Sequence, residues 1–199
     1  MMRGKLEAVD PRTGCVGEWL FAPPPEAVVV DRPLADGLLT LADRVMPCFE
    51  ECGLCVVTGV ALRPIGGPDA TYASLKETIA AVDSNLTSLP SSEASIEVDC
   101  TVVVYDGEAR IPINHGAMIC WRWIGEPVIQ VKIYCDAFLP NLLDGTVNPL
   151  GQQNRSRLET ALQALQTELK ATVEIGDDEM PWTTAQGFLL DNRGDEGSK

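Results

Sequence analysis

The chain has 199 residues, with 15 Lys and Arg against 29 Asp and Glu, which gives a formal net charge of −14. A field of this sign repels phosphate backbones and anionic lipid headgroups, so the composition excludes nucleic acid and membrane surfaces as expected partners and favours a basic protein. With 45% hydrophobic residues the chain can bury a substantial core. We expect a single globular domain at residues 1–192 and a disordered tail at 193–199.

The compartment follows from the N-terminal residues and the cysteines. Residues 1–7 carry charges before any apolar run, unlike a secretory signal, and no stretch reaches the roughly 20 apolar residues of a membrane span. The chain has seven cysteines, an odd number that favours free thiols over a disulfide framework. We therefore predict a cytoplasmic protein.

In chain order, the first elements are short strands. Residues 5–9 and 15–21 flank turn residues and predict a hairpin, and residues 27–30 predict a short buried strand beyond the break at Pro23, Pro24 and Pro25.

The next element is a helix at residues 34–52, whose apolar residues recur every three or four positions. Asp31 is placed to cap this helix, Pro47 to kink it or end it early, and Gly53 to stop it. A strand at 54–62 should follow.

Two further helices have recognisable starts. Asp69 is placed to cap a helix that ends at Pro90, and the capping box that begins at Ser156 opens a third helix after a loop at 140–153.

Residues 96–138 between these helices predict a three-stranded antiparallel meander, because apolar and polar residues alternate in its first and third strands. If Asp106 and Gly107 alone form the first turn, Val102 pairs with Ile111 and Val98 with His115. A three-residue second loop, 125–127, would pair Trp121 with Val131. This register makes one face apolar and places His115 in the packed face.

The other face of this meander is the candidate partner-binding surface, because aromatic, amide and cationic side chains gather there in an otherwise anionic chain. Its candidate residues are Tyr105, Asn114, Met118, Arg122, Gln130, Lys132 and Tyr134.

Cys48, Cys52 and Cys55 are the candidate metal ligands. Their C-x3-C-x2-C spacing resembles the motif with which radical-SAM enzymes hold an iron–sulfur cluster, although Leu54 stands where that family usually has an aromatic residue. The alternative, which we favour, is that the thiols lie on the core side of a helix.

No other feature indicates catalysis. His115 is the only histidine, and a buried, hydrogen-bonded structural role is the favoured interpretation. We assign no catalytic residue and no cofactor, and we lean against an enzyme.

Together these features predict an α+β fold in which the meander packs on flanking helices, with N-terminal strands added. The order of helix, three strands and helix resembles secretion chaperones in arrangement and acidity. We expect a non-enzymatic protein-binding module, an adaptor, chaperone-like or immunity-type protein, with a protein partner and a possible homodimer. The alternatives are a metal or iron–sulfur protein that uses the three cysteines, and a small-molecule enzyme with a pocket between the sheet and residues 140–153.

Overall fold

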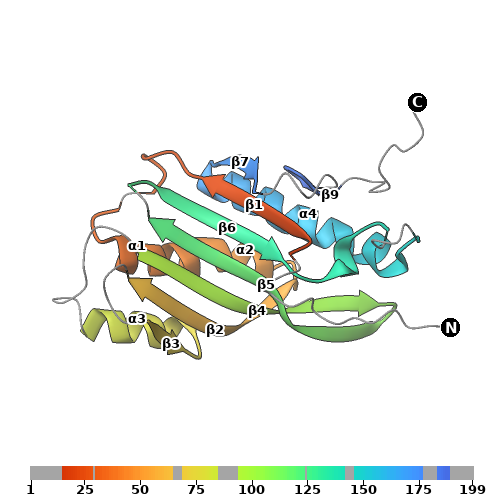
Figure 1. The fold of residues 1–199 in the computed structure, drawn as a ribbon, viewed down its shortest axis with the longest axis horizontal. Helices are drawn as coiled ribbons and strands as arrows, with labels where there is room; N and C mark the ends of the chain where they lie inside the picture. The colour runs from red at the N-terminus through yellow and green to blue at the C-terminus, as the bar shows by residue number, and fades with distance from the viewer. Residues whose placement is uncertain are drawn as a thin grey trace.

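The computed structural model describes residues 15–28, 30–64, 69–84, 94–123, 125–141, 146–176 and 183–188. It confirms the α+β class: a seven-stranded antiparallel sheet carries helices on one side (Figure 1). The predicted tail at 193–199 lies outside the described residues. No helix in the described part of the chain is long and apolar enough to cross a membrane.

The sheet has the strand order β3-β2-β4-β5-β6-β1-β7 and is larger than the three predicted strands. Its strands are β1 (Gly17–Ala22), β2 (Cys55–Pro64), β3 (Ala70–Tyr72), β4 (Ala94–Asp106), β5 (Ala109–Trp123), β6 (Pro127–Ile133) and β7 (Thr172–Ile175). A separate two-stranded hairpin joins β8 (Thr183–Thr184) to β9 (Gly187–Phe188).

The N-terminal prediction is partly wrong. Residues 5–9 lie outside the described residues, and β1 pairs with β6 and β7. The strand predicted at 27–30 does not form at residues 27, 28 and 30. The amide of Ala27 instead donates to the carbonyl of Pro24 at 2.8 Å, which folds this segment into a turn.

The first helical segment is continuous and comprises α1 (Pro33–Thr40), a π-helical turn η1 (Leu41–Val45) and α2 (Met46–Glu50). Pro47 has no amide proton for the carbonyl four residues earlier, and the chain widens just before it, where the Met46 amide donates to the carbonyl of Leu41. The segment ends at Gly53, whose φ of 57° suits a residue without a Cβ.

The predicted starts of the two later helices are wrong. Helix α3 (Leu75–Ser84) follows β3 and is capped by Ser74, not Asp69, because the Glu77 amide donates to Ser74 Oγ at 3.3 Å and the Ala73 amide donates to Glu77 Oε2. Helix α4 (Pro149–Leu169) begins well before Ser156. Asn148 caps it by accepting from the Leu150 amide at 3.2 Å.

The predicted register is wrong by two positions near the β4–β5 turn and between β5 and β6, and by four positions between β4 and β5 beyond Cys100. Both shifts are even, so the two faces of the sheet keep their side chains. Asp106 pairs with Ala109, so Val102 lies opposite Ile113, not Ile111. A register shift between Cys100 and Val102 inserts extra residues into β5. Strand β6 begins at Pro127, and Trp121 pairs with Ile129, not Val131.

The core lies between the sheet and the helices, and α1 packs against Trp121 of β5 at Gly37. A Cβ added to Gly37 would lie 2.3 Å from Nε1 of Trp121, whose side chain is fully buried. The absence of a side chain at residue 37 therefore sets how closely α1 can pack on β5.

Helix α4 covers the free edge of β4 with side-chain amides. β4 runs beyond the last residue it pairs with β2, and there the buried Asn154 accepts from the Tyr105 amide and donates to the Tyr105 carbonyl, both at 2.8 Å. Gln153 bonds the Gly107 backbone in the same two-sided way. These amides satisfy backbone groups that a neighbouring strand would otherwise bond.

We expect Gly37→Ala to lower the free energy of unfolding by about 1–3 kcal/mol, because the methyl group overpacks the contact with Trp121. This sign is opposite to the usual gain from Gly to Ala inside a helix. Urea unfolding followed by tryptophan fluorescence measures it. Gly59→Ala is the control, since its Cβ would meet its nearest atoms at 3.9 Å. A stabilised Gly37→Ala protein would contradict this packing.

We expect Asn154→Ala to destabilise the protein by about 2–3 kcal/mol, because it leaves two partly buried backbone groups of Tyr105 without these partners. Gln153→Ala removes an equivalent but exposed pair and should cost less than about 1 kcal/mol, since water replaces the lost bonds. Chemical denaturation of both variants gives the comparison. Equal costs would show that α4 does not seal this edge.

Candidate functional site

The seven predicted surface residues are distributed unevenly. Met118, Arg122, Gln130 and Lys132 share the sheet face opposite the core, because Met118 pairs with Lys132 and Arg122 lies opposite Val128. Met118, Arg122 and Lys132 are half-buried and Asn114 is exposed. Gln130 and Tyr134 are buried, with 4% and 3% of their surface exposed. Fewer side chains are therefore accessible on this face than the seven that the sequence predicted.

Tyr105 has another role. The guanidinium of Arg157, from α4, stacks over its ring at 4.3 Å, and Arg110 lies 5.4 Å from the ring centroid. Arg157 also donates to the carbonyls of Cys52, Gly53 and Val103. Tyr105 thus helps to pack the β4–β5 hairpin against α4 and the C-terminal end of α2.

The charges on the sheet face surround the buried thiol of Cys120. Burial and the neighbouring Glu97 raise the Cys120 pKa to about 12, while Arg122 and Lys132 act in the opposite direction. Beside it, Gln130 Nε2 donates to Glu18 Oε1, and Gln130 Oε1 is buried without a hydrogen-bond partner. Burial also raises the pKa of Tyr134, so its hydroxyl stays protonated.

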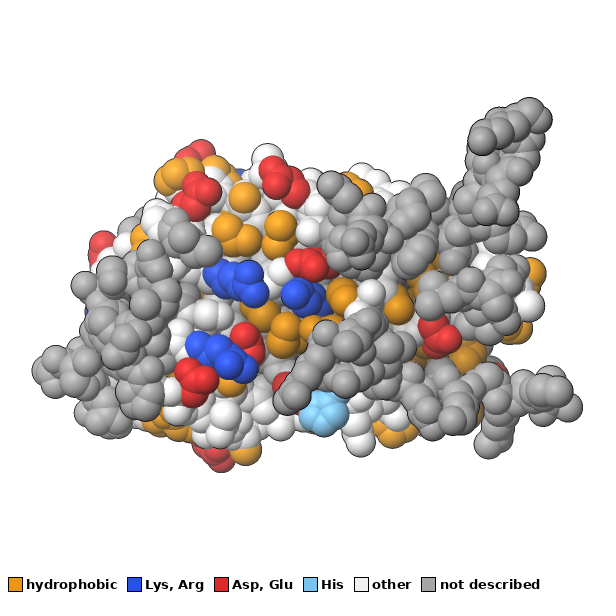
Figure 2. All heavy atoms as spheres, in the orientation of Figure 1, with side chains coloured by type: hydrophobic (Ala, Val, Ile, Leu, Met, Phe, Trp, Pro, Cys, Tyr) orange, Lys and Arg blue, Asp and Glu red, His pale blue; other side chains and the backbone are white. Residues whose placement is uncertain are grey.

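Lys132 and Arg63, two of the described cations on this face, are paired with acidic residues. Lys132 lies 3.8 Å from Glu18, and Arg63 lies 2.9 Å from Glu97 and 3.3 Å from Asp69. Arg122 makes no ion pair or hydrogen bond with any residue that the structure describes. Figure 2 shows Lys and Arg side chains next to acidic and hydrophobic side chains on this face. Arg122 is therefore a cation that is available to a partner near the centre of this face.

His115 is not buried, contrary to the sequence prediction. It sits where β5 carries its extra residues, its φ is 55°, and its side chain is 64% exposed. The predicted register placed it opposite Val98, whereas Val98 pairs with Ile119. A positive φ is unusual outside glycine, and strained backbone of this kind clusters at functional sites.

The imidazole of His115 is oriented by a carboxylate. Its Nδ1 lies 2.6 Å from Asp99 Oδ2, and Thr58 Oγ1 donates to the same oxygen at 3.2 Å. Such a pair can hold the tautomer of a base or a metal ligand. Because the Thr58 hydroxyl bonds the carboxylate and not the imidazole, the three residues do not have the order of a nucleophile–base–acid triad.

The candidate metal ligands do not form a cluster. No group of three His, Cys, Asp or Glu side chains in the described part of the chain could hold a metal ion. Cys48 donates to the Arg44 carbonyl at 3.2 Å, Cys55 is buried at the start of β2, and burial raises the pKa of the Cys48 and Cys52 thiols. A raised pKa opposes the thiolate that a metal binds. All seven cysteines are free.

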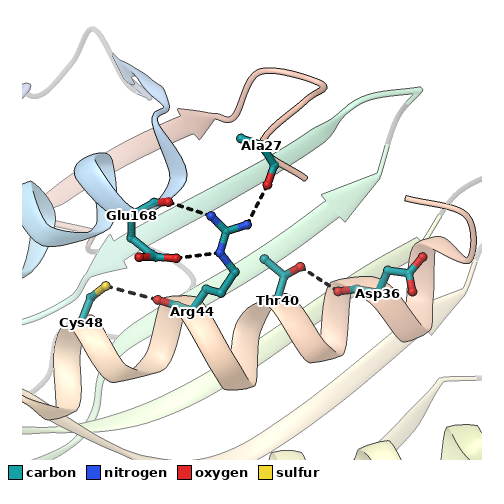
Figure 3. A network of polar contacts seen from close by, with 6 residues as sticks. All are labelled: Ala27, Asp36, Thr40, Arg44, Cys48 and Glu168. Carbon is teal, nitrogen blue, oxygen red and sulfur yellow. Dashed lines mark hydrogen bonds and ion pairs between the residues drawn. The ribbon is translucent and has the colours of Figure 1, made fainter. Parts of the chain in front are cut away.

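On the helical side, Arg44 joins three elements that are distant in sequence (Figure 3). Its Nε and Nη2 donate to the carboxylate and the carbonyl of Glu168 at 2.8 and 2.7 Å, and Nη1 donates to the Ala27 carbonyl at 2.8 Å. The helical pattern of the sequence did not mark this residue. The π-helical turn, in which Arg44 lies, could not be predicted from residue spacing.

Comparisons with protein-family models, with curated proteins and with solved structures found no match.

We expect His115→Gly to be more stable than His115→Ala by about 1 kcal/mol, because only glycine adopts a positive φ without strain. Both variants lose the contact with Asp99, so the difference isolates the backbone. At the neighbouring Asn114, which has no positive φ, the order should reverse, with Gly about 0.5–1 kcal/mol less stable than Ala. Thermal unfolding of the four variants measures both differences. The same order at both positions would refute the strain at His115.

Proposed function

We propose that this protein is a non-enzymatic binding module of the adaptor, chaperone or immunity type, which docks a protein partner on the sheet face around Arg122. The observation that supports this most is Arg122 itself. The residue is half-buried, yet its guanidinium has no ion pair or hydrogen bond within the described residues. Arginine with this exposure is enriched among the residues that dominate interface affinity.

The surroundings of Arg122 support the same conclusion. Val128 lies opposite it across the strand pair, and Met118 is on the same face of the same strand. The centre of a protein interface is typically rich in methionine, arginine and apolar side chains and poor in other charged residues. The paired ions Lys132 and Glu18 would lie toward the rim, where they contribute specificity more than affinity.

The electrostatics favour a basic partner over a second copy of this chain. Two copies with a net charge of −14 each repel one another, whereas a partner of opposite sign is steered toward the protein. At the contact itself the requirement is local: the partner must present a carboxylate or a carbonyl to Arg122. We infer a cytoplasmic setting, in which the seven free cysteines stay reduced.

We expect Arg122→Glu to weaken binding of the partner at least 30-fold, a loss of about 2 kcal/mol that is typical of a hot spot. The partner is first captured from the source cells on wild-type protein and then purified, and the two affinities are measured by titration calorimetry. Lys76→Glu is the matched control, since it makes the same change of charge at an exposed position on α3.

The proposal fails if Arg122→Glu and Lys76→Glu bind the partner equally well. Sedimentation equilibrium tests separately whether a second copy of the chain covers the Arg122 face. A wild-type homodimer that Arg122→Glu dissociates would show that a second copy, not a basic protein, covers this face.

A further inference from the structure

A groove on the helical side offers a second binding surface. It has a volume of about 640 Å³, is open to solvent, and runs between the segment η1–α2 and the second half of α4. The residues of α4 that line it extend from Thr160 to Glu168, which corresponds to about 12 Å at the rise of an α-helix. The groove is therefore longer than a single side chain requires.

The walls of the groove are anionic. The carboxylates of Asp43, Glu51 and Glu168 line it against the single guanidinium of Arg44, which leaves a net charge of −2. Arg44 is committed to Glu168 and Ala27 through all three of its nitrogens. The carboxylates of Asp43 and Glu51, both exposed, make no hydrogen bond or ion pair with any residue that the structure describes.

Apart from Gln163, whose exposed side-chain amide can donate as well as accept, the remaining polar groups of the groove donate their protons to backbone carbonyls. Thr160 and Thr167 donate to carbonyls of α4 at 2.8 Å. The Cys48 thiol donates to the Arg44 carbonyl at 3.2 Å, as Figure 3 shows. The groove therefore presents acceptors and few donors. Pro47 and Ala164 add apolar surface, against which the alkyl stems of Lys or Arg side chains can pack.

We propose that this groove binds a peptide segment of a partner that carries two or more Lys or Arg side chains, whose cationic groups meet Asp43 and Glu51. Asp43 and Glu51 lie two helical turns apart on one wall, so one cationic side chain can reach each of them. Charge complementarity selects the segment, and the length of the groove favours a peptide over a compact cation. A π-helical turn, a feature frequent at functional sites, forms part of this wall.

The groove lies on the helical side and the Arg122 face on the opposite side of the sheet, so this inference does not rest on the proposed function (Figure 1).

The probe is a blocked alanine-rich peptide with arginine at positions i, i+4 and i+8, titrated calorimetrically into the full chain. The comparison peptide has citrulline in place of each arginine, which keeps the shape and removes the charge. We expect only the arginine peptide to bind, and its affinity to fall at least tenfold in Asp43→Asn/Glu51→Gln. Both residues are exposed, so the variant should keep the wild-type circular dichroism spectrum.

The matched control is Glu108→Gln/Glu126→Gln, which removes two exposed carboxylates from the loops at the ends of β5. Its affinity should stay within twofold of wild type, and so should that of Arg122→Glu. Equal losses in the two double variants would show that the peptide senses only the net charge, and no loss in either would remove the groove as its site. Spermidine that binds as tightly as the peptide would overturn the assignment to a peptide.

Discussion

The side-chain amide of Asn154 makes the contact that fixes helix α4 against the sheet. It bonds both backbone groups of Tyr105 and also donates to the Leu150 carbonyl of its own helix, so it joins α4 to the part of β4 that β2 does not reach. A buried amide with every group bonded specifies one arrangement, since any shift of α4 along the edge leaves polar groups unpaired. The position of α4 in turn sets one wall of the helical groove.

Arg157 extends the same joint to the first helical segment. Its guanidinium stacks on Tyr105 and bonds the carbonyls of Cys52 and Gly53, where α2 ends in a left-handed glycine. The C-terminal carbonyls of a helix need donors, and an arginine satisfies several at once. At the other end of the groove, Arg44 bonds α4 from the opposite wall. The two arginines thus connect the first helical segment to α4 at two places, and the groove lies between these two segments.

The edges of the sheet limit how a partner could bind. β3 and β7 are short, with three and four residues. On β5, residues before Ala117 have no β6 neighbour, but Pro112 offers no amide and His115 breaks the regular backbone there. Proline and bulges at an edge are known devices against the addition of a strand. Docking on the face of the sheet is therefore more consistent with this architecture than strand addition.

The sequence predicted the α+β class, the alternation of β4 and β6 and the free cysteines, because these follow from local periodicity and composition. It could not predict the register, since no local pattern marks the extra residues that β5 carries at His115. The sequence contains the capping box of Ser74 and Glu77, but Asp69 is also a residue type that caps helices, and the two could not be told apart. For the site, alternation predicted which side chains share the sheet face, but not that Gln130 and Tyr134 are buried.

Arg44 and Arg122 show why residue type alone could not identify the binding surfaces. Both are half-buried arginines in an acidic protein, yet one makes three hydrogen bonds and the other makes none within the described residues. The groove beside Arg44 is anionic, because the guanidinium is bonded to the Glu168 carboxylate and two carbonyls. Asp43 and Glu51, by contrast, have no partner among the described residues. Arg122 carries an unpaired positive charge on a sheet face where the neighbouring cations and carboxylates are paired. A chain of strongly negative net charge can in this way present two surfaces of different polarity, one on each side of the same sheet.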